Sequence, residues 1–225
     1  MIPLKDDNPT STYSYITVGL IIINILVFIY ELSWGAHFEH LLGKYGATPI
    51  LLLNNMPAPK EYPGPFITIF TSMFLHAGFF HVAGNMLYLW IFGNNIEDSM
   101  GHLRFIIFYL VCGIIAVYTF SLVNPRSTIP MIGASGAVSG VLGAYLILFP
   151  RAKVLTLIPF GFYVQMVKVP AIFVLGMWIV LQIINGMLSN RTGGGVAWFA
   201  HIGGFIAGMA LISLFKRRKI AASLI

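Results

Sequence analysis

The stretch of the chain that decides the fold is residues 133–148, which read GASGAVSGVLGAYLIL. It lies within a longer uncharged segment, residues 127–150. Small residues recur at helical spacing along it, at Gly136, Ser139, Gly140, Gly143 and Ala144. Such a face lets membrane helices approach each other closely. We therefore expect a membrane-embedded helix that begins near Ser135 and packs tightly against another helix.

The composition extends the membrane assignment from this stretch to the whole chain. Of the 225 residues, 58% are hydrophobic and 9% are charged, whereas soluble domains contain roughly 45–50% and roughly 25%. Seven acidic and thirteen basic side chains are too few to cover a water-soluble globule of 24.8 kDa. These numbers exclude a soluble enzyme, a disordered tail and a fibrous repeat. They favour one membrane-embedded domain over residues 1–225.

The net charge of +6 does not indicate a nucleic-acid partner. The basic residues stand singly between apolar runs, except for a cluster at residues 216–219 that follows a hydrophobic segment. A cluster of this kind contacts anionic lipid and fixes the orientation of the chain. The single cysteine, Cys112, excludes an intrachain disulfide and a Cys-rich metal site, and we expect a buried thiol there.

Six stretches are long and apolar enough to cross a membrane, which takes about 20 residues. We therefore predict an all-α membrane protein, a six-helix transmembrane bundle with a long outer loop, residues 33–79, between its first two helices. Two shorter apolar segments, 41–53 and 154–167, are interpreted as loops, the second at the membrane interface. The predicted spans are approximately 14–32, 79–96, 105–123, 135–149, 169–188 and 196–215.

The basic residues orient this predicted bundle. Six spans put both termini on one side, and if that side is cytoplasmic, nine Lys and Arg residues lie inside and four outside. The positive-inside rule supports this orientation. Because the sequence shows no long extramembrane domain, we expect a multi-pass protein of a bacterial cell (inner) membrane with both termini in the cytoplasm. No internal repeat is visible, which disfavours the transporters built from inverted repeats.

Polar side chains at membrane depth are costly and by default indicate function. In the predicted topology, His81 and Asn85 stand near the start of the second span. Ser135 stands near the start of the fourth, and His201 about one turn into the sixth. All four then share the outer leaflet, which scattered structural residues would have no reason to do. The full set at membrane depth is Asn24, His76, His81, Asn85, Ser135, Ser139, Gln182, Asn185 and His201.

These residue types suit acyl transfer. Ser135 is flanked by glycines at a helix start, where unpaired N–H groups stabilise an oxyanion. His201 can take the proton of Ser135 and later give it to the leaving amine. His81 and Asn85 share one helix face and can donate hydrogen bonds to the same developing negative charge. Since no carboxylate lies at that depth, we expect a Ser–His dyad.

Each of these residues also has a structural interpretation. Ser135 alone is typical of a packing serine, and the glycines after His201 follow a helix-packing spacing. His81 and Asn85 alone are typical of an interhelical hydrogen-bonded pair. Their joint placement favours catalysis over these separate interpretations.

Other membrane hydrolases fit this sequence less well. The H-E-x-x-H motif of zinc proteases is missing. An aspartyl protease needs two aspartates within the membrane, and the aspartates of this chain are Asp6, Asp7 and Asp98. Residues 37–40, HFEH, are interpreted as an amphipathic loop rather than a metal site. We expect no metal and no cofactor.

Together, these motifs resemble those of the rhomboid family of intramembrane serine proteases. The resemblance covers nearly the whole chain, and the motifs occur in the family's order. Three of them carry it: a His/Asn pattern at His76, His81 and Asn85, a G-x-S-G nucleophile motif at 133–136, and a catalytic-histidine motif at His201, Gly204 and Gly208.

The resemblance implies roles for the matching residues. Ser135 would be the nucleophile and His201 the base, while His81, Asn85 and the Ser135 backbone N–H would form the oxyanion site. The fifth span would be a mobile helix that gates substrate entry. Some members carry a tyrosine four residues after the nucleophile, packed on the catalytic histidine. Here that position is Ser139, so another group must orient His201.

We therefore expect an intramembrane serine endopeptidase that cleaves transmembrane protein substrates near the outer membrane face. Its partners would be those substrates and the lipid bilayer, with no nucleic acid. The alternative is a catalytically inactive rhomboid-like protein that binds membrane helices. A transporter or channel would need a polar path through both leaflets, and the inner halves of the fourth and sixth spans are too apolar for one.

Overall fold

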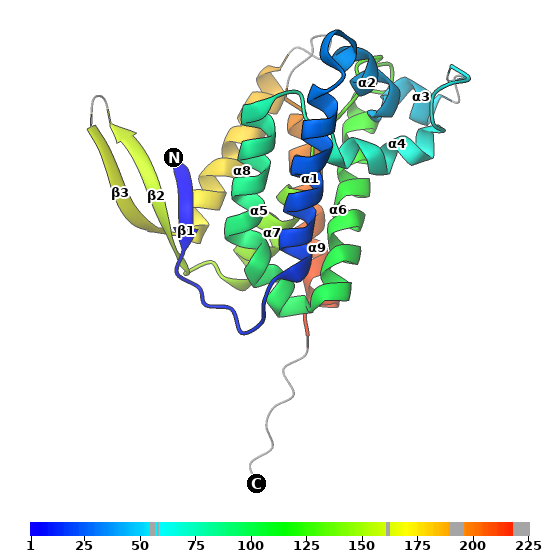
Figure 1. Ribbon diagram of the computed structural model, residues 1–225. Helices are drawn as coiled ribbons and strands as arrows, with labels where there is room; N and C mark the ends of the chain where they lie inside the picture. Colours follow the sequence, from blue (N-terminus) through cyan, green and yellow to red (C-terminus); the bar gives the residue numbers. More distant parts are fainter. Residues whose placement is uncertain (55–56, 58, 161–162, 190–195, 218–225) are drawn as a thin grey trace.

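Six long helices make up the body of the computed structural model of the chain (Figure 1). The structure describes residues 1–54, 57, 59–160, 163–189 and 196–217. Each long helix falls on one of the six apolar stretches predicted from the sequence. They are α1 (Tyr15–Leu32), α5 (Phe79–Met100), α6 (His102–Val123), α7 (Ser135–Leu148), α8 (Ala171–Leu188) and α9 (Trp198–Phe215).

Four of these helices, α1, α6, α8 and α9, are long and apolar enough to cross a membrane. A fifth span is possible if α5 is joined to the preceding segment Pro65–Phe74, from which it is bent by 81°. Helix α7 has only 14 residues, so its length of about 21 Å falls short of the hydrocarbon core of about 30 Å. The count of six spans therefore remains a prediction. So does the inside-to-outside balance of charges, since Arg191, Arg218 and Lys219 lie outside the described residues.

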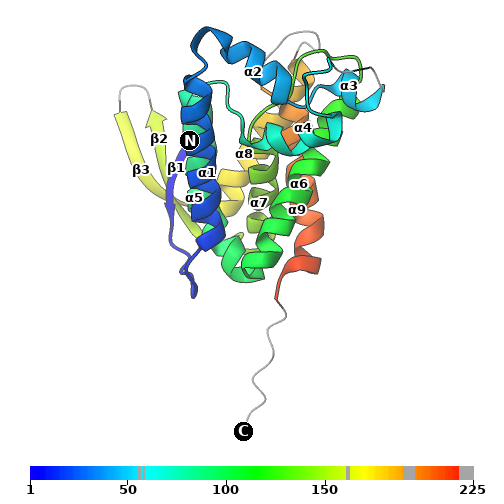
Figure 2. The ribbon, with the colours of Figure 1, turned by 45° about the vertical axis from the view of Figure 1, so that its right-hand side comes forward.

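Helix α7 is the centre of the bundle, in contact with α5, α6, α8 and α9 (Figure 2). Every residue from 136 to 145 is buried. The glycines of α7 and α9 interlock: a methyl group on Gly204 would collide with the carbonyl oxygen of Gly136, and one on Gly208 with that of Gly140. The two backbones therefore touch. The close contact predicted from the small residues of α7 is confirmed, and it brings the N-terminal ends of both helices together.

The long connection between α1 and α5 folds into short helices gathered at one end of the bundle (Figure 2). The apolar segment 41–53 is divided between two of them, neither longer than 8 residues. It therefore forms no helix of membrane-spanning length, as expected, but its interpretation as a loop is wrong. The elements of the connection are η1 (Gly35–His37), α2 (Phe38–Tyr45), α3 (Pro49–Leu53), α4 (Pro65–Thr71) and η2 (Ser72–Phe74).

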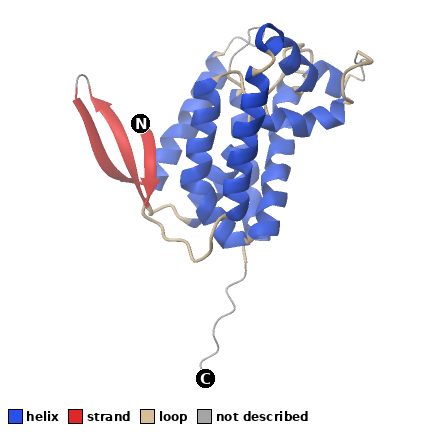
Figure 3. Ribbon diagram, in the orientation of Figure 1, coloured by secondary structure: helices blue, strands red, loops and turns tan. Residues whose placement is uncertain are grey.

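A three-stranded antiparallel sheet stands beside the helices, so the expectation of an all-α protein is wrong (Figure 3). Its order is β1 (Ile2–Asp6), β2 (Lys153–Phe160) and β3 (Tyr163–Pro170). Of the segment 154–167, expected to be an interfacial loop, residues 154–160 and 163–167 instead form most of β2 and β3. Short runs rich in valine, leucine, isoleucine and threonine on either side of a Gly indicate a hairpin. A segment too short to span the membrane as a helix is long enough for two strands.

The N-terminal strand is held to the end of α7 by a buried hydrogen bond. The hydroxyl of Tyr145 donates to Oδ2 of Asp6 across 2.7 Å. Burial raises the pKa of the Asp6 carboxyl, and the hydrogen bond from Tyr145 partly opposes that rise. The same strand pairs with β2, about 150 residues further along the chain, so β1 is joined both to the sheet and to α7.

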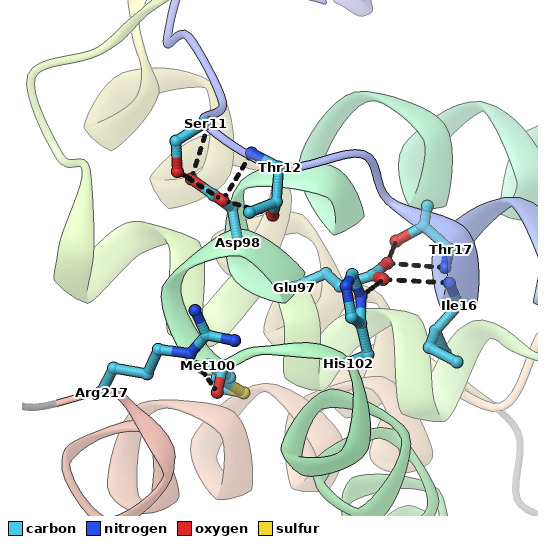
Figure 4. A network of polar contacts seen from close by, with 9 residues as sticks. All are labelled: Ser11, Thr12, Ile16, Thr17, Glu97, Asp98, Met100, His102 and Arg217. Carbon is cyan, nitrogen blue, oxygen red and sulfur yellow. Dashed lines mark hydrogen bonds and ion pairs between the residues drawn. The ribbon is translucent and has the colours of Figure 1, made fainter.

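Two neighbouring carboxylates at the end of α5 fasten the segment before α1 (Figure 4). Asp98 accepts hydrogen bonds from the backbone and side chains of Ser11 and Thr12. Glu97 accepts from the backbone N–H groups at the start of α1 and from the hydroxyl of Thr17. The carboxylate oxygens there satisfy unpaired N–H donors and interact favourably with the positive end of the helix dipole. This acidic pair is thus structural and lies at the opposite end of α5 from His81.

Candidate active site

The chain enters α7 through a backbone turn that only glycine suits. Gly133 has φ of +116°, where an L side chain is strained. Its N–H donates to the carbonyl oxygen of Ser72 across 2.8 Å. A Cβ on Gly133 would lie 2.7 Å from Nε2 of His81 and 3.5 Å from Oγ of Ser135. The side chains of His81 and Ser135 therefore border the same small space, which the missing side chain leaves open.

Ser135 and His201 make a direct hydrogen bond, although 66 residues separate them in the chain. Oγ of Ser135 lies 2.8 Å from Nε2 of His201. Ser135 is the first residue of α7 and His201 lies in the first turn of α9. Both therefore occupy the helix ends that the interlocked glycines hold together. This arrangement is the one that nucleophile and base need, within about 2.6–3.2 Å of each other.

His201 is enclosed by aromatic rings and one amide. It is 8% exposed. Its ring centroid lies 5.9 Å from that of Trp178 on α8 and 6.2 Å from that of Trp198 on α9. Its second ring nitrogen, Nδ1, lies 2.7 Å from Oε1 of Gln182, also on α8. Sequence reasoning placed Gln182 at membrane depth but gave it no role. Its spacing of four residues after Trp178 was the signal available, since both then share one face of α8.

His81 presents an N–H group toward Ser135. The backbone N–H of Ala77 donates to Nδ1 of His81 across 3.3 Å, so in the neutral ring the hydrogen is on Nε2. That nitrogen is the atom that borders the space at Gly133. The orientation makes His81 a hydrogen-bond donor beside Ser135.

Asn85 lies one turn further along the same face of α5. Its side chain is buried, at 7% exposed. The amide nitrogen Nδ2 has no hydrogen-bond partner among the residues that the structure describes. A buried amide donor without a partner is costly, and such orphans in native structures call for an explanation. A substrate oxygen that carries negative charge would supply the partner.

All four predicted site residues line one cavity of about 1020 Å³. Its walls also include Tyr88 on α5 and Trp178 on α8, whose ring centroids lie 6.4 Å apart. The cavity is therefore bounded by the second and fifth of the six long helices as well as by α7 and α9.

The remaining polar residues of the motifs have structural contacts. His76 is fully buried, its backbone N–H donates to the carboxylate of Glu31, and its ring packs 5.0 Å from that of His81. Ser139 donates its hydroxyl to the carbonyl oxygen of Ser135 across 2.6 Å. Ser139 is thus turned toward its own helix and makes no hydrogen bond to His201.

The fold and the site define a class of protein: a multi-pass integral membrane protein whose helices enclose a serine hydrogen-bonded to a histidine. The chain belongs to the rhomboid family, because the family model described as the Rhomboid domain matches residues 63–218, more than half of the chain. The resemblance drawn from the motifs is confirmed. Members of this family are in general intramembrane serine proteases that act on transmembrane substrates.

Several curated proteins are similar to the chain. Rhomboid protease GluP of Bacillus subtilis is 29% identical over 228 aligned positions, which cover 98% of this chain and 39% of that protein. Rhomboid protein 1, mitochondrial, of Saccharomyces cerevisiae is 33% identical over 160 positions, 67% of this chain and 42% of that protein. RHOMBOID-like protein 1 of Arabidopsis thaliana is 35% identical over 150 positions, which cover 67% of this chain and 34% of that protein. The chain therefore spans about two fifths or less of the length of these relatives.

Proposed function

We propose that this protein is an intramembrane serine endopeptidase that cleaves transmembrane protein substrates near the outer membrane face with a Ser135–His201 dyad. The observation that supports the proposal most directly is the 2.8 Å contact between Oγ of Ser135 and Nε2 of His201 inside the cavity. A serine bonded only to water or to backbone would be a weak nucleophile at neutral pH.

In the proposed first step, Nε2 of His201 takes the hydroxyl proton while Oγ of Ser135 attacks the scissile carbonyl carbon. The carbonyl π electrons move to oxygen, and the oxyanion accepts hydrogen bonds from Nε2–H of His81, Nδ2–H of Asn85 and the Ser135 backbone N–H. These donors stand in place before the reaction, so they stabilise the charge as it develops. Collapse of the tetrahedral intermediate breaks the C–N bond, and His201 gives its proton to the leaving amine.

In the second step, water attacks the acyl carbon of the ester on Ser135. His201 takes a proton from that water and returns it to Oγ of Ser135 as the C–O bond breaks. The products are a free carboxyl group and the regenerated dyad, so no proton or electron is gained or lost by the enzyme. The four side chains that this cycle uses all line the cavity.

The proposed substrate is a membrane helix that unwinds near the cut. A helical backbone hides its carbonyl carbons behind side chains and intrahelical hydrogen bonds, whereas attack by Ser135 needs an extended segment. Small or helix-destabilising residues near the scissile bond lower the cost of unwinding. We place the cut near the outer face because Ser135 begins α7, and the positive-inside orientation puts that end outward.

The test is hydrolysis of a single-span membrane protein with glycine near its outer boundary, incubated with the purified chain in proteoliposomes. Wild-type protein is expected to produce two fragments, and Ser135→Ala none. The matched control is Ser121→Ala, which removes the buried hydroxyl of a serine on α6 that has no hydrogen-bond partner among the described residues. Folded wild-type protein that neither cleaves the substrate nor reacts with a fluorophosphonate would instead support the inactive, helix-binding alternative.

A further inference from the structure

A buried glutamine contacts the ring nitrogen of His201 that faces away from Ser135. Gln182 is 6% exposed and is the one polar side chain among the five buried residues of α8. Its Oε1 lies 2.7 Å from Nδ1 of His201. A polar side chain buried on a helix that otherwise faces lipid is costly unless it is hydrogen-bonded. The hydrogen bond to His201 therefore offsets the cost of burying Gln182 at this position.

The other end of the same amide determines which atom of Gln182 faces the histidine. Nε2 of Gln182 lies 3.2 Å from the carbonyl oxygen of Trp178. A carbonyl oxygen only accepts hydrogen bonds, so the NH₂ group must face it. Oε1 must then face His201 and accept, which places a hydrogen on Nδ1.

The consequence reaches Ser135 through the ring of His201. A neutral imidazole carries its hydrogen on one nitrogen and leaves the other as an acceptor. With the hydrogen on Nδ1, Nε2 is the free acceptor, and Nε2 is the atom 2.8 Å from Oγ of Ser135. The opposite tautomer would point an N–H group at the serine and could not take its proton.

No carboxylate hydrogen-bonds to His201 in the part of the chain that the structure describes. Ser139, which occupies the position of the stacking tyrosine of some relatives, donates to Ser135 instead. The aromatic neighbour on the face of His201 is Trp178, at an interplanar angle of 32°. Gln182 and Trp178 therefore both hold His201 from α8.

We infer that Gln182 is the positioning residue of the dyad: its side-chain carbonyl accepts from Nδ1–H of His201 and so selects the tautomer that activates Ser135. The inference rests on the proposed serine-protease function and deepens it. A neutral amide serves here where soluble serine proteases use an aspartate, and it adds no negative charge at membrane depth.

The test compares three substitutions at one position. Gln182→Met keeps the length and volume of the side chain and removes the acceptor, whereas Gln182→Glu restores an acceptor oxygen. Gln182→Asn keeps the amide on a side chain one methylene shorter. Two rates are measured: fluorophosphonate labelling of Ser135, located by peptide mass, and steady-state cleavage of the transmembrane substrate.

For Gln182→Met and Gln182→Asn we expect labelling and kcat to fall together by roughly 10- to 100-fold, the worth of one buried hydrogen bond to an ionising partner. KM should stay within about twofold, because an interaction made to the base rather than to the substrate leaves ground-state binding unchanged. Gln182→Glu should recover most of the loss. Because the Asn variant keeps a polar group, it decides the matter if the Met variant does not fold.

The matched control is Leu175→Ala on the same helix. Leu175 is fully buried, and it stands two turns away from Gln182. In the Leu175→Ala protein, Ser135 should be labelled at the wild-type rate, although this substitution removes more packing than Gln182→Met. The inference is overturned if the Met and Asn variants label at the wild-type rate, or if Leu175→Ala loses as much as they do. A wild-type protein that is neither labelled nor active would instead overturn the dyad itself, and with it the role of Gln182.

Discussion

Replacing Gly204 with alanine tests whether the contact between α7 and α9 creates the dyad. The added methyl group would collide with the carbonyl oxygen of Gly136. The oxygen belongs to the backbone of α7, and the methyl group would be attached rigidly to the backbone of α9, so no flexible side chain can move aside. The helices must separate, and the ends that carry Ser135 and His201 must separate with them.

The size of the effect follows from the contact distances. Carbon and oxygen atoms need about 3.5 Å between them, so relief of the clash with Gly136 requires the helices to move apart by about 1.5 Å. The hydrogen bond of 2.8 Å between Ser135 and His201 would then lengthen beyond its useful range. A misplacement of about 1 Å costs about 100-fold in rate, and overpacking a close-packed site costs about 1–3 kcal/mol in the free energy of unfolding.

The assay measures both quantities on the same preparation. The rate of fluorophosphonate labelling reports the activation of Ser135, and thermal unfolding in detergent reports stability. The control is Gly176→Ala on α8, where a methyl group would meet nothing within 4 Å. That control gains helix propensity of about 1 kcal/mol and should label at the wild-type rate.

Two results would refute the reasoning. A Gly204→Ala protein that labels at the wild-type rate would mean that the helix separation does not determine the dyad geometry. A Gly176→Ala protein that loses as much rate as Gly204→Ala would mean that any methyl group in the bundle disturbs the site. The first result, if the Gly204→Ala protein were also less stable, would show that packing between α7 and α9 affects stability without affecting the activation of Ser135.

Three further predictions concern the oxyanion donors, the orientation and the N-terminal strand. Asn85→Ala should lower kcat by less than the roughly 10²–10³-fold typical of one oxyanion donor, because His81 Nε2–H and the Ser135 N–H remain. Unchanged hydrolysis in the double variant His81→Ala/Asn85→Ala would remove both side chains from the mechanism. A reporter fused after the C-terminus should be cytoplasmic, and a reporter on the outer side would contradict the shared outer-leaflet placement of the site. Because burial raises the pKa of Asp6 above 3.8, the charged form is disfavoured in the folded state, so thermal stability should fall as the pH rises from about 4 through that raised pKa. Asp6→Asn keeps an acceptor for the hydroxyl of Tyr145, and its unfolding temperature should be flat over the same pH window; the same slope in both proteins would assign the dependence to another group.

The amide of Gln182 shows why part of the site could not be predicted. Its hydrogen bond to His201 depends on how α8 is rotated against α9, and rotation is set by packing across the whole interface. Hydropathy is nearly uniform around these helices, since lipid and protein interior are equally apolar. A sequence pattern that distinguishes the inner face of a soluble helix is therefore weak here.

The sheet illustrates a second limit. The hairpin of β2 and β3 was visible in principle as two short runs of β-forming residues around a glycine. The third strand was not, because β1 stands at the opposite end of the chain and its pairing depends on a long-range contact. Asp6 and Tyr145 carry no local signal that they meet.

By itself, the sequence determined the membrane class, the six apolar helices and the residues proposed to carry the chemistry, because hydrophobic length and the Gly-flanked motifs around Ser135 and His201 are local properties. Only the tertiary structure decided that these two side chains lie 2.8 Å apart, that Gln182 faces the second nitrogen of the histidine, and that the N-terminus joins a sheet. Each of these depends on backbone approach between distant segments. The glycine faces of α7 and α9 permit that approach, but the register and rotation in which they meet come from close packing of the whole bundle.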